Sequence, residues 1–247
     1  MKQPLNSSNL LVQALKYSIP VLLGYMAIGI AFGLLIVDAG YPWWISLITS
    51  VIMYAGAGQY LAVGLFAAGA SLGEACLVQL VVNARHIAYG LSLFKRINQA
   101  GPYKFYLIFA LTDETFALLS SLPAAAPGTE DAKPHRQGRL MFYIALLNQA
   151  YWVAGSLIGA IAGTLIPFNM EGISFALTAL FIVLMIEQIL RVKRPLPFVV
   201  SALAAILGTL LLPSRLSLLS AMVLSLVLVR LLDQGGKDRN NPGASPC

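Results

Sequence analysis

The sequence predicts an all-α integral membrane protein, a polytopic bundle of about seven or eight membrane segments. Hydrophobic residues make up 58% of the 247-residue chain and charged residues only 11%, whereas a soluble domain averages about 25% charged residues. The apolar residues form long uncharged runs, and one membrane span needs roughly 20 of them. Backbone groups in lipid must bond internally, which a helix does within one segment. The runs also lack the alternation of a transmembrane β-barrel.

These runs define a transmembrane domain over residues 17–232. It lies between a polar N-terminal segment, 1–16, and a Gly- and Pro-containing tail, 233–247, which we expect to be disordered. A polar segment at 123–139, rich in Pro, Gly and charge, divides the domain into two halves. The apolar runs of the first half (17–122) are 17–37, 43–73, 75–94 and 105–122, and those of the second half (140–232) are 140–169, 173–190, 196–213 and 216–232.

The net charge is +6, and most of the basic residues lie between the apolar runs. This placement favours orientation in an anionic membrane and gives no pattern typical of nucleic-acid binding. Basic residues at 191–194, in the tail and near the N-terminus predict that all three regions face the cytoplasm. Simple alternation of spans then leaves the basic residues at 95–104 outside. A fold-back within 43–71 corrects this but moves the 123–139 loop outside, so no arrangement satisfies every loop.

A sequence echo links the two halves. Tyr25, Gly29 and Gly33 recur at the same spacing as Tyr151, Gly155 and Gly159, in the first long run of each half. A two-fold internal repeat is common in secondary transporters. Chance is the alternative reading, because Gly at four-residue spacing is frequent in membrane helices.

The run at 54–60 carries the first polar constellation, Tyr54-Ala55-Gly56-Ala57-Gly58-Gln59-Tyr60. Each glycine weakens a helix by roughly 1 kcal/mol relative to alanine. We therefore predict a broken helix near Tyr54–Gln59, whose freed amides bind a polar ligand such as a carboxylate. Close helix packing through small residues is the alternative.

The second constellation is Asn83-Ala84-Arg85-His86-Ile87-Ala88-Tyr89-Gly90. Asn83, His86 and Gly90 share one helical face by their spacing, and Asn83 is a candidate for ligand binding. Histidine titrates near neutral pH, so His86 is a candidate proton carrier. Arg85 points elsewhere and is expected either to anchor at the interface or to form a structural ion pair.

The third constellation, Leu111-Thr112-Asp113-Glu114-Thr115-Phe116, is the strongest. Charges at membrane depth cost about 2.5 kcal/mol or more each and persist where something requires them. Asp113 and Glu114 cannot face the same spot on a helix, so we expect one to face a cavity and the other to pair with Arg85. Both are candidate proton-coupling residues. A structural ion pair, or a span that ends at Asp113, is the alternative.

Soluble-enzyme motifs are missing from the sequence. We find no Walker-A loop, dinucleotide fingerprint, zinc pattern or nucleophile elbow, so we expect no catalytic residues, no metal, no cofactor and no ATP hydrolysis by this chain. Cys76 and Cys247 define neither a disulfide framework nor a metal site.

From about residue 17 to 231 the sequence resembles the AzlC family, the large subunits of bacterial branched-chain amino acid exporters. The resemblance rests on Ser18-Ile19-Pro20, Tyr54–Gln59, Ala84-Arg85-His86 with Tyr89-Gly90, and Leu111–Glu114, in this order and spacing. Gly58 departs from the family pattern, where a serine is expected.

The resemblance implies a permease of the bacterial cytoplasmic (inner) membrane that exports leucine, isoleucine, valine and sometimes methionine. It also implies an AzlD-type small membrane subunit as partner. Read with the residues, it assigns the amino acid substrate to Tyr54, Gly56, Gly58, Gln59 and Asn83, and the proton motive force as driving energy. A permease energised by a separate ATPase, and a membrane enzyme or sensor, are the two alternatives.

Overall fold

The structure, a computed structural model, describes residues 10–122, 134–165, 182, 185–186, 189–190, 196–211, 224–225 and 227–228. The chain divides into two compact units, Met1–Leu177 and Thr178–Cys247. Each regular element in the described residues is a helix, which confirms the all-α prediction. Within the same residues two helices are long and apolar enough to cross a bilayer, Leu10–Asp38 and His135–Leu165. The total of seven or eight segments stays a prediction.

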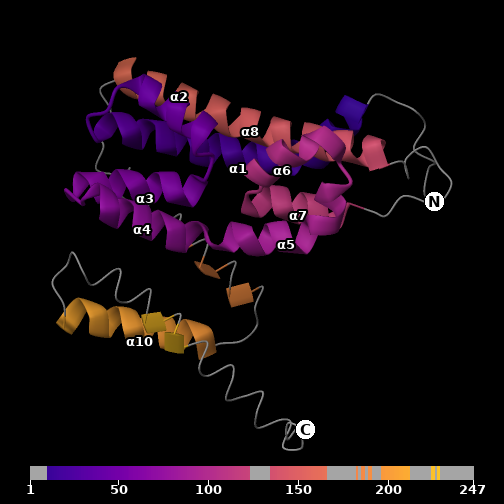
Figure 1. Ribbon diagram of the computed structural model, residues 1–247. Helices are drawn as coiled ribbons and strands as arrows, with labels where there is room; N and C mark the ends of the chain where they lie inside the picture. Colours follow the sequence, from indigo (N-terminus) through magenta and orange to yellow (C-terminus); the bar gives the residue numbers. More distant parts are fainter. Residues whose placement is uncertain are drawn as a thin grey trace, which may run out of the picture. The chain divides into compact units, whose positions relative to one another are not determined.

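Two long helices, α1 (Leu10–Asp38) and α8 (Pro134–Leu165), form the spine of the first unit and run in the same direction (Figure 1). Their glycines allow the backbones to touch. A Cβ on Gly33 would overlap the backbone of α8, and one on Gly159 would overlap the carbonyl of Ile30 on α1. Small residues permit such close approach in membrane helices. The two glycine stripes of the sequence echo therefore pack against each other within one chain.

The predicted broken helix is present, but the break lies earlier than expected. Helix α2 (Trp43–Ile52) ends before a short turn at Met53–Ala55, and α3 (Gly56–Ala67) begins at the first glycine. Tyr54 has a φ of 40°, in the left-handed region that non-glycine residues seldom adopt. The glycines are thus helical, and the expectation that they break the helix was wrong: the strained backbone is at Tyr54.

The next two helices, α4 (Leu72–Asn83) and α5 (Arg85–Asn98), follow each other with an interruption at Ala84. Ser71 caps α4 reciprocally with Glu74 in a capping box. The hydrogen bonds around Ala84 span three residues instead of four, which tightens the helix locally. The single helical face predicted for Asn83, His86 and Gly90 is therefore interrupted after its first member.

The apolar run at 105–122 is also broken, which the sequence analysis did not foresee. A 3-10 turn, η1 (Gly101–Tyr103), leads into α6 (Lys104–Phe109), and α7 (Asp113–Ser121) begins after three non-helical residues. Asp113 and Glu114 therefore open a helix and do not lie in the middle of one.

The two broken pairs, α2–α3 and α6–α7, lie along opposite halves of α1 and α8 in Figure 1. Their breaks meet, because the rings of Tyr54 and Phe109 lie 6.3 Å apart. Gln149 on α8 joins the pairs: its Oε1 accepts from Tyr106 at 2.6 Å and its Nε2 donates to the Val51 carbonyl at 3.0 Å. The α2 and α3 helices, at about 1.5 Å per residue, each match half of a bilayer's hydrocarbon core.

With this second fold-back, one orientation becomes compatible with all the basic loops of the first unit. All basic side chains of the described residues except Arg85 lie on the segments that meet where α8 begins: Lys16, Lys95, Arg96, Lys104, Arg136 and Arg139. At this end Gly101 faces His135, and Gly138 packs against Ala100. Asp38 and Glu74 are the described acids at the opposite end. For the described residues, the positive-inside rule now predicts one consistent cytoplasmic end, at which α7 ends and α8 begins.

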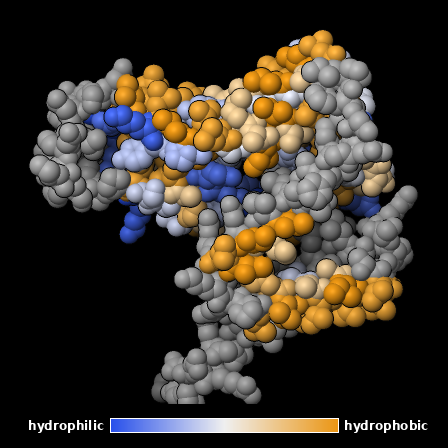
Figure 2. Space-filling view, turned by 180° about the vertical axis from the view of Figure 1, so that it is seen from behind, coloured by the Kyte–Doolittle hydropathy of each residue, from blue (hydrophilic) through white to orange (hydrophobic). Residues whose placement is uncertain are grey.

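Apolar side chains cover much of the molecular face seen in Figure 2. Among the described residues, Leu23 and Leu80 are 74% and 71% exposed. Soluble monomers seldom expose contiguous apolar surface of this extent. A lipid-facing surface accounts for it.

The second unit contains α10 (Leu196–Leu211), which matches the predicted apolar run at 196–213. The runs at 173–190 and 216–232, the tail and Glu187 lie largely or wholly outside the described residues, so the internal repeat stays a prediction. In the first unit, α1 begins at Leu10 and α8 at Pro134. Helix therefore extends into both the N-terminal segment and the 123–139 loop.

Candidate functional site

The acidic pair is positioned by the start of α7. Thr112 is the N-cap, and its hydroxyl accepts a hydrogen bond of 3.2 Å from the amide of Thr115. Asp113 and Glu114 follow in the first turn, where the positive end of the helix dipole stabilises negative charge. The break before α7 thus offsets part of the cost of placing two carboxylates at this depth.

Asp113 is held by two partners on α5. Its Oδ2 lies 2.9 Å from Nη1 of Arg85, and its Oδ1 accepts a hydrogen bond from the Tyr89 hydroxyl. Tyr89 in turn stacks on Phe116, with ring centroids 4.5 Å apart. Both ion-pair side chains are largely shielded, at 30% and 21% exposed. The carboxylate of Asp113 therefore has a counter-charge and a fixed direction.

Glu114 faces a different environment. Its Oε2 accepts a hydrogen bond of 2.7 Å from Tyr25 on α1. Tyr25 is 4% exposed, and its ring meets Trp152 edge-on at 5.5 Å. Among the described residues no basic side chain forms an ion pair with Glu114. The two adjacent carboxyls therefore differ: one is ion-paired, and the other is hydrogen-bonded by a neutral phenol.

Tyr25 connects Glu114 to a set of buried hydroxyls and one amide, which we call the central polar cluster: Tyr25, Thr112, Glu114, Thr115 and Asn148. Tyr25 Oη lies 2.6 Å from Thr112 Oγ1, which lies 3.0 Å from Thr115 Oγ1. Asn148 on α8 donates to Thr115 at 3.0 Å. The cluster therefore links α1, α7 and α8 through continuous hydrogen bonds.

Two buried polar atoms at the cluster have no hydrogen bond that meets ordinary geometry: the hydroxyl of Tyr54, which lies beside the cluster, and Oδ1 of Asn148, one of its members. Tyr54 lies next to Tyr25 and Thr115. Buried polar groups are nearly always bonded. These two atoms at the meeting point of the helix breaks are therefore exceptional.

Gln59, expected to bind substrate, is committed to a second buried network. It accepts from the indole of Trp152 at 2.9 Å and donates to Ser50 at 3.2 Å. Ser50 donates to Ser156 at 2.9 Å. These bonds hold α2 and α3 against α8. The geometry therefore supports a structural role for the Gln59 amide.

The remaining members of the expected substrate set lie apart from the acidic pair. Gly56 leaves room for the Trp152 ring, which a Cβ would meet at 3.0 Å. The carbonyl of Gly58 accepts from Gln79 at 2.6 Å, and Asn83 donates to the same Gln79 side chain at 3.0 Å. Of the five predicted substrate residues, Tyr54 alone reaches the central polar cluster.

His86, the third proposed proton carrier, lies in the first turn of α5. Its ring meets that of Tyr89 edge-on at 5.8 Å, and it faces Arg85 and Asp113. It thus belongs to the Asp113 side of the site. Three or more side chains able to hold a metal ion do not come together within the described residues.

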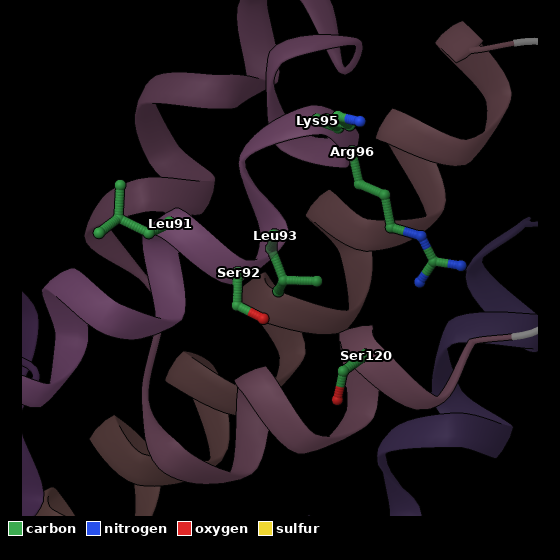
Figure 3. A pocket seen from close by; sticks show the side chains of 6 residues that line it. All are labelled: Leu91, Ser92, Leu93, Lys95, Arg96 and Ser120. Atoms are coloured by element: carbon green, nitrogen blue, oxygen red, sulfur yellow. The ribbon is translucent and has the colours of Figure 1, made fainter. Parts of the chain in front are cut away.

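A separate open pocket of about 420 Å³ lies between α5 and α7, lined by Leu91, Ser92, Leu93, Lys95, Arg96 and Ser120 (Figure 3). Ser120 is at the opposite end of α7 from the acidic pair. Arg96 donates to the carbonyls of Leu119 and Leu122 at 2.8 and 3.0 Å. It therefore caps the end of α7, as basic side chains commonly do.

Sequence reasoning missed Thr112 and Thr115 as site residues, and gave no site role to Tyr25. One signal was available: Thr112 directly before Asp113 and Glu114 is a helix start pattern, an N-cap followed by acids. It predicts both the break and the hydroxyl beside the carboxylates. Tyr25 carries no such local signal, because its role depends on packing between α1 and α7.

The fold and site define a polytopic helical membrane protein whose discontinuous helices meet around buried polar groups, as in secondary transporters. The family model described as AzlC protein matches residues 20–166, well over half of the chain. The chain belongs to the AzlC family, which confirms the resemblance in the sequence.

Curated relatives agree with this assignment. The branched-chain amino acid transport protein AzlC of Bacillus subtilis is 37% identical over 73% of this chain and 68% of its own. An uncharacterized membrane protein of Helicobacter pylori is 38% identical over 88% and 92%. The inner membrane protein YgaZ of Escherichia coli is 30% identical over 96% and 97%. The predicted membrane localisation is confirmed, and no solved structure matches the chain.

Proposed function

We propose that this chain is a permease that exports branched-chain amino acids, namely leucine, isoleucine, valine and sometimes methionine, across the cytoplasmic membrane. The proton motive force drives it, and a small AzlD-type membrane subunit works with it. The substrate class is supported by the name of the Bacillus subtilis relative. The energy source is supported by the geometry of the acidic pair.

The observation that carries proton coupling is the difference between Asp113 and Glu114. Protonation of Asp113 would break its ion pair with Arg85 at 2.9 Å. Glu114 accepts from Tyr25 and lacks an ion-pair partner within the described helices. It can therefore gain or lose a proton while the ion pair next to it persists. We assign Glu114 as the proton carrier, and the Arg85–Asp113 pair as the support of the site.

His86 stays a candidate relay on the Asp113 side, because histidine exchanges protons near neutral pH. Its contact with Tyr89, which bonds Asp113, joins it to the site. A relay between solvent and Glu114 is the role that fits this position.

The fold-back helices supply the substrate path. Broken helices leave backbone groups free for a ligand at the depth where they end. Tyr54 lies at this depth beside the central polar cluster, so we place the polar part of the amino acid there. Gly58 and Asn83 line the α3–α4 side of the proposed path, and Gly56 lines it beside Trp152 of α8. Gln59 stabilises the walls of the path by accepting a hydrogen bond from the Trp152 indole.

The small subunit is supported by the family alone. The glycine stripes of α1 and α8 are used against each other, so they do not serve as its docking surface. A partner would instead meet the exposed apolar side chains of other faces.

The deciding experiment is transport in proteoliposomes that contain this chain with its small subunit. Labelled leucine should exchange in counterflow, and net flux should increase with a proton gradient and stop with an uncoupler. Matched liposomes without protein set the background. Flux that needs ATP and a further subunit would favour an ATP-driven permease. No flux of any branched-chain amino acid would favour a membrane enzyme or sensor.

A further inference from the structure

The open pocket between α5 and α7 lies at the depth where a bilayer changes from hydrocarbon to headgroups. Arg85, the first residue of α5, pairs with Asp113 at the level of the helix breaks. Lys95 lies about 15 Å further along the helix, which is half of the roughly 30 Å hydrocarbon core. Leu91 lies about 6 Å short of this boundary. The pocket therefore extends from the acyl chains to the headgroup region on the cytoplasmic side.

The walls of the pocket change in chemistry along this depth. Leu91, which lines it, and the neighbouring Phe94 are 71% and 62% exposed, so an apolar rim faces the lipid. Lys95 and Arg96 lie on the same side of the pocket, away from Leu91 (Figure 3). The volume of about 420 Å³ is typical of a site for a small group. An apolar rim beside a basic wall matches a phospholipid, whose acyl chains continue from a charged phosphate.

The two basic side chains of the pocket have different surroundings. Arg96 donates to the carbonyls of Leu119 and Leu122 at 2.8 and 3.0 Å. The end of α7 carries partial negative charge at these carbonyls. The charge of Arg96 is therefore offset by the helix end that it caps. Lys95 remains as the positive charge that can attract an anion into the pocket.

Lys95 and Ser92 provide donors that no described group uses. Within the described residues Lys95 forms no ion pair, and no carboxylate lines the pocket. The Ser92 hydroxyl also has no partner there, whereas the Ser120 hydroxyl donates to the Ala117 carbonyl at 3.0 Å. Ser92 and Lys95 share one face of α5, because they are three positions apart. One ammonium and one hydroxyl are thus placed to bind the oxygens of a phosphate.

We propose that this pocket binds one anionic phospholipid of the cytoplasmic leaflet, with its phosphate at Lys95 and Ser92 and an acyl chain along Leu91. Basic pockets between membrane helices on the cytoplasmic side bind anionic headgroups in this way. A zwitterionic headgroup brings its own cation and leaves Lys95 without a net counter-charge. A soluble phosphate ester leaves the apolar rim without an occupant. The bound lipid joins α5 to the end of α7, and its binding is independent of the transported substrate.

Native mass spectrometry of the purified full chain in detergent measures this lipid directly. The wild type should retain one phosphatidylglycerol in preference to phosphatidylcholine. Lys95→Gln should bind phosphatidylglycerol about fivefold more weakly, because one basic residue at an anionic surface contributes ~1 kcal/mol. Lys104→Gln is the matched control, since it removes the same charge at the same end of the molecule. Lys104 lies over the Phe105 ring at 5.2 Å, outside the pocket, so this variant should keep the wild-type affinity.

Two further variants separate the space of the pocket from its charge. Ser92→Leu fills the pocket and keeps Lys95, so it should also lose the lipid, whereas Ser92→Ala leaves the space open and should retain more. Phosphatidylglycerol should raise the thermal midpoint of the wild type by about 2–4 °C, and should not raise that of Lys95→Gln. Arg96→Gln should lower the midpoint even without lipid, because the α7 carbonyls lose their cap.

Four results would overturn the lipid site. Equal losses in Lys95→Gln and Lys104→Gln would mean diffuse attraction to a charged membrane. Equal retention of phosphatidylcholine and phosphatidylglycerol would contradict selection by net charge. Displacement of the lipid by glycerol 1-phosphate at the same concentration would assign the pocket to soluble phosphate esters. Loss of the lipid when the small subunit is present would assign it to the subunit interface. If Ser92→Leu does not fold, the two lysine variants still decide the question.

Discussion

The hydroxyl of Tyr25 on α1 donates a 2.7 Å hydrogen bond to Glu114, the second residue of α7. This bond joins α1, the first long helix of the chain, to α7, a half-length helix that begins beside Tyr25. It also distinguishes Glu114 from Asp113, whose carboxylate is paired with Arg85. The difference leads to the first of five predictions.

Glu114→Gln should make transport independent of the proton gradient. Glutamine can still accept the bond from Tyr25, but it cannot gain or lose a proton. In proteoliposomes, the ratio of leucine flux with and without a gradient should fall to about one, the value expected when no proton is coupled. Full stimulation by the gradient in this variant would refute Glu114 as carrier.

Arg85→Gln and Asp113→Asn should each lower stability by about 1–2 kcal/mol, less than for a fully buried pair because both side chains keep some exposure. The double variant should lose less than the sum of the two, because one charge is no longer left alone. Thermal unfolding of the four proteins in detergent gives the cycle. Additive losses would contradict an energetic role for the ion pair.

Gly33→Ala should destabilise the first unit by about 1–3 kcal/mol, because the added Cβ would overlap the α8 backbone. Gly24→Ala on the same helix is the matched control, since nothing lies within 4 Å of its Cβ position. It should raise stability by up to about 1 kcal/mol, the difference in helix propensity between glycine and alanine. Equal stability of the two variants would argue against tight packing of α1 on α8.

Single cysteines should reveal the two fold-backs. In a protein with Cys76 and Cys247 replaced by serine, Asp38→Cys and Ala70→Cys should both react with an impermeant thiol reagent from outside the cell. Lys104→Cys and Ser121→Cys should both be protected in intact cells and react after lysis. Labelling of Asp38→Cys and Ala70→Cys from opposite sides would mean that α2 and α3 together cross the membrane.

Gln59→Leu should cost about 1–3 kcal/mol of stability, because the buried indole of Trp152 loses its acceptor. The exposed Gln99 provides a control, and Gln99→Leu should change stability by no more than about 0.5 kcal/mol. Thermal unfolding measures both. If Gln59→Leu leaves stability unchanged and weakens leucine binding, Gln59 is a substrate-binding residue and not a structural one.

The fold class was predictable because apolar runs in lipid leave helix as the only local solution. A break near Tyr54 was predicted, but from the wrong residues: the strained residue is Tyr54, and the glycines start the next helix. The α6–α7 break was overlooked because the run at 105–122 is apolar on both sides of Asp113. A Thr-Asp-Glu start pattern was the local sign of it.

The site was predictable in its charges and not in its partners. Costly carboxylates at depth pointed to Asp113 and Glu114 without any tertiary information. Their different surroundings come from α5 and α1, which are distant in sequence. Gln59 shows the opposite failure: a polar residue in a helix break looked like a ligand-binding group, and its partners are Trp152 and Ser50.

The half-length helices also have an electrical consequence. The helix α2, with 10 residues, covers about 15 Å of the roughly 30 Å hydrocarbon core. A unit charge that crosses the whole core moves through about 2.3 kcal/mol per 100 mV of membrane potential. A charge that stops where the two breaks meet has moved through about half of this, roughly 1.2 kcal/mol per 100 mV. The voltage drop is thereby divided into two nearly equal steps, one on each side of Glu114.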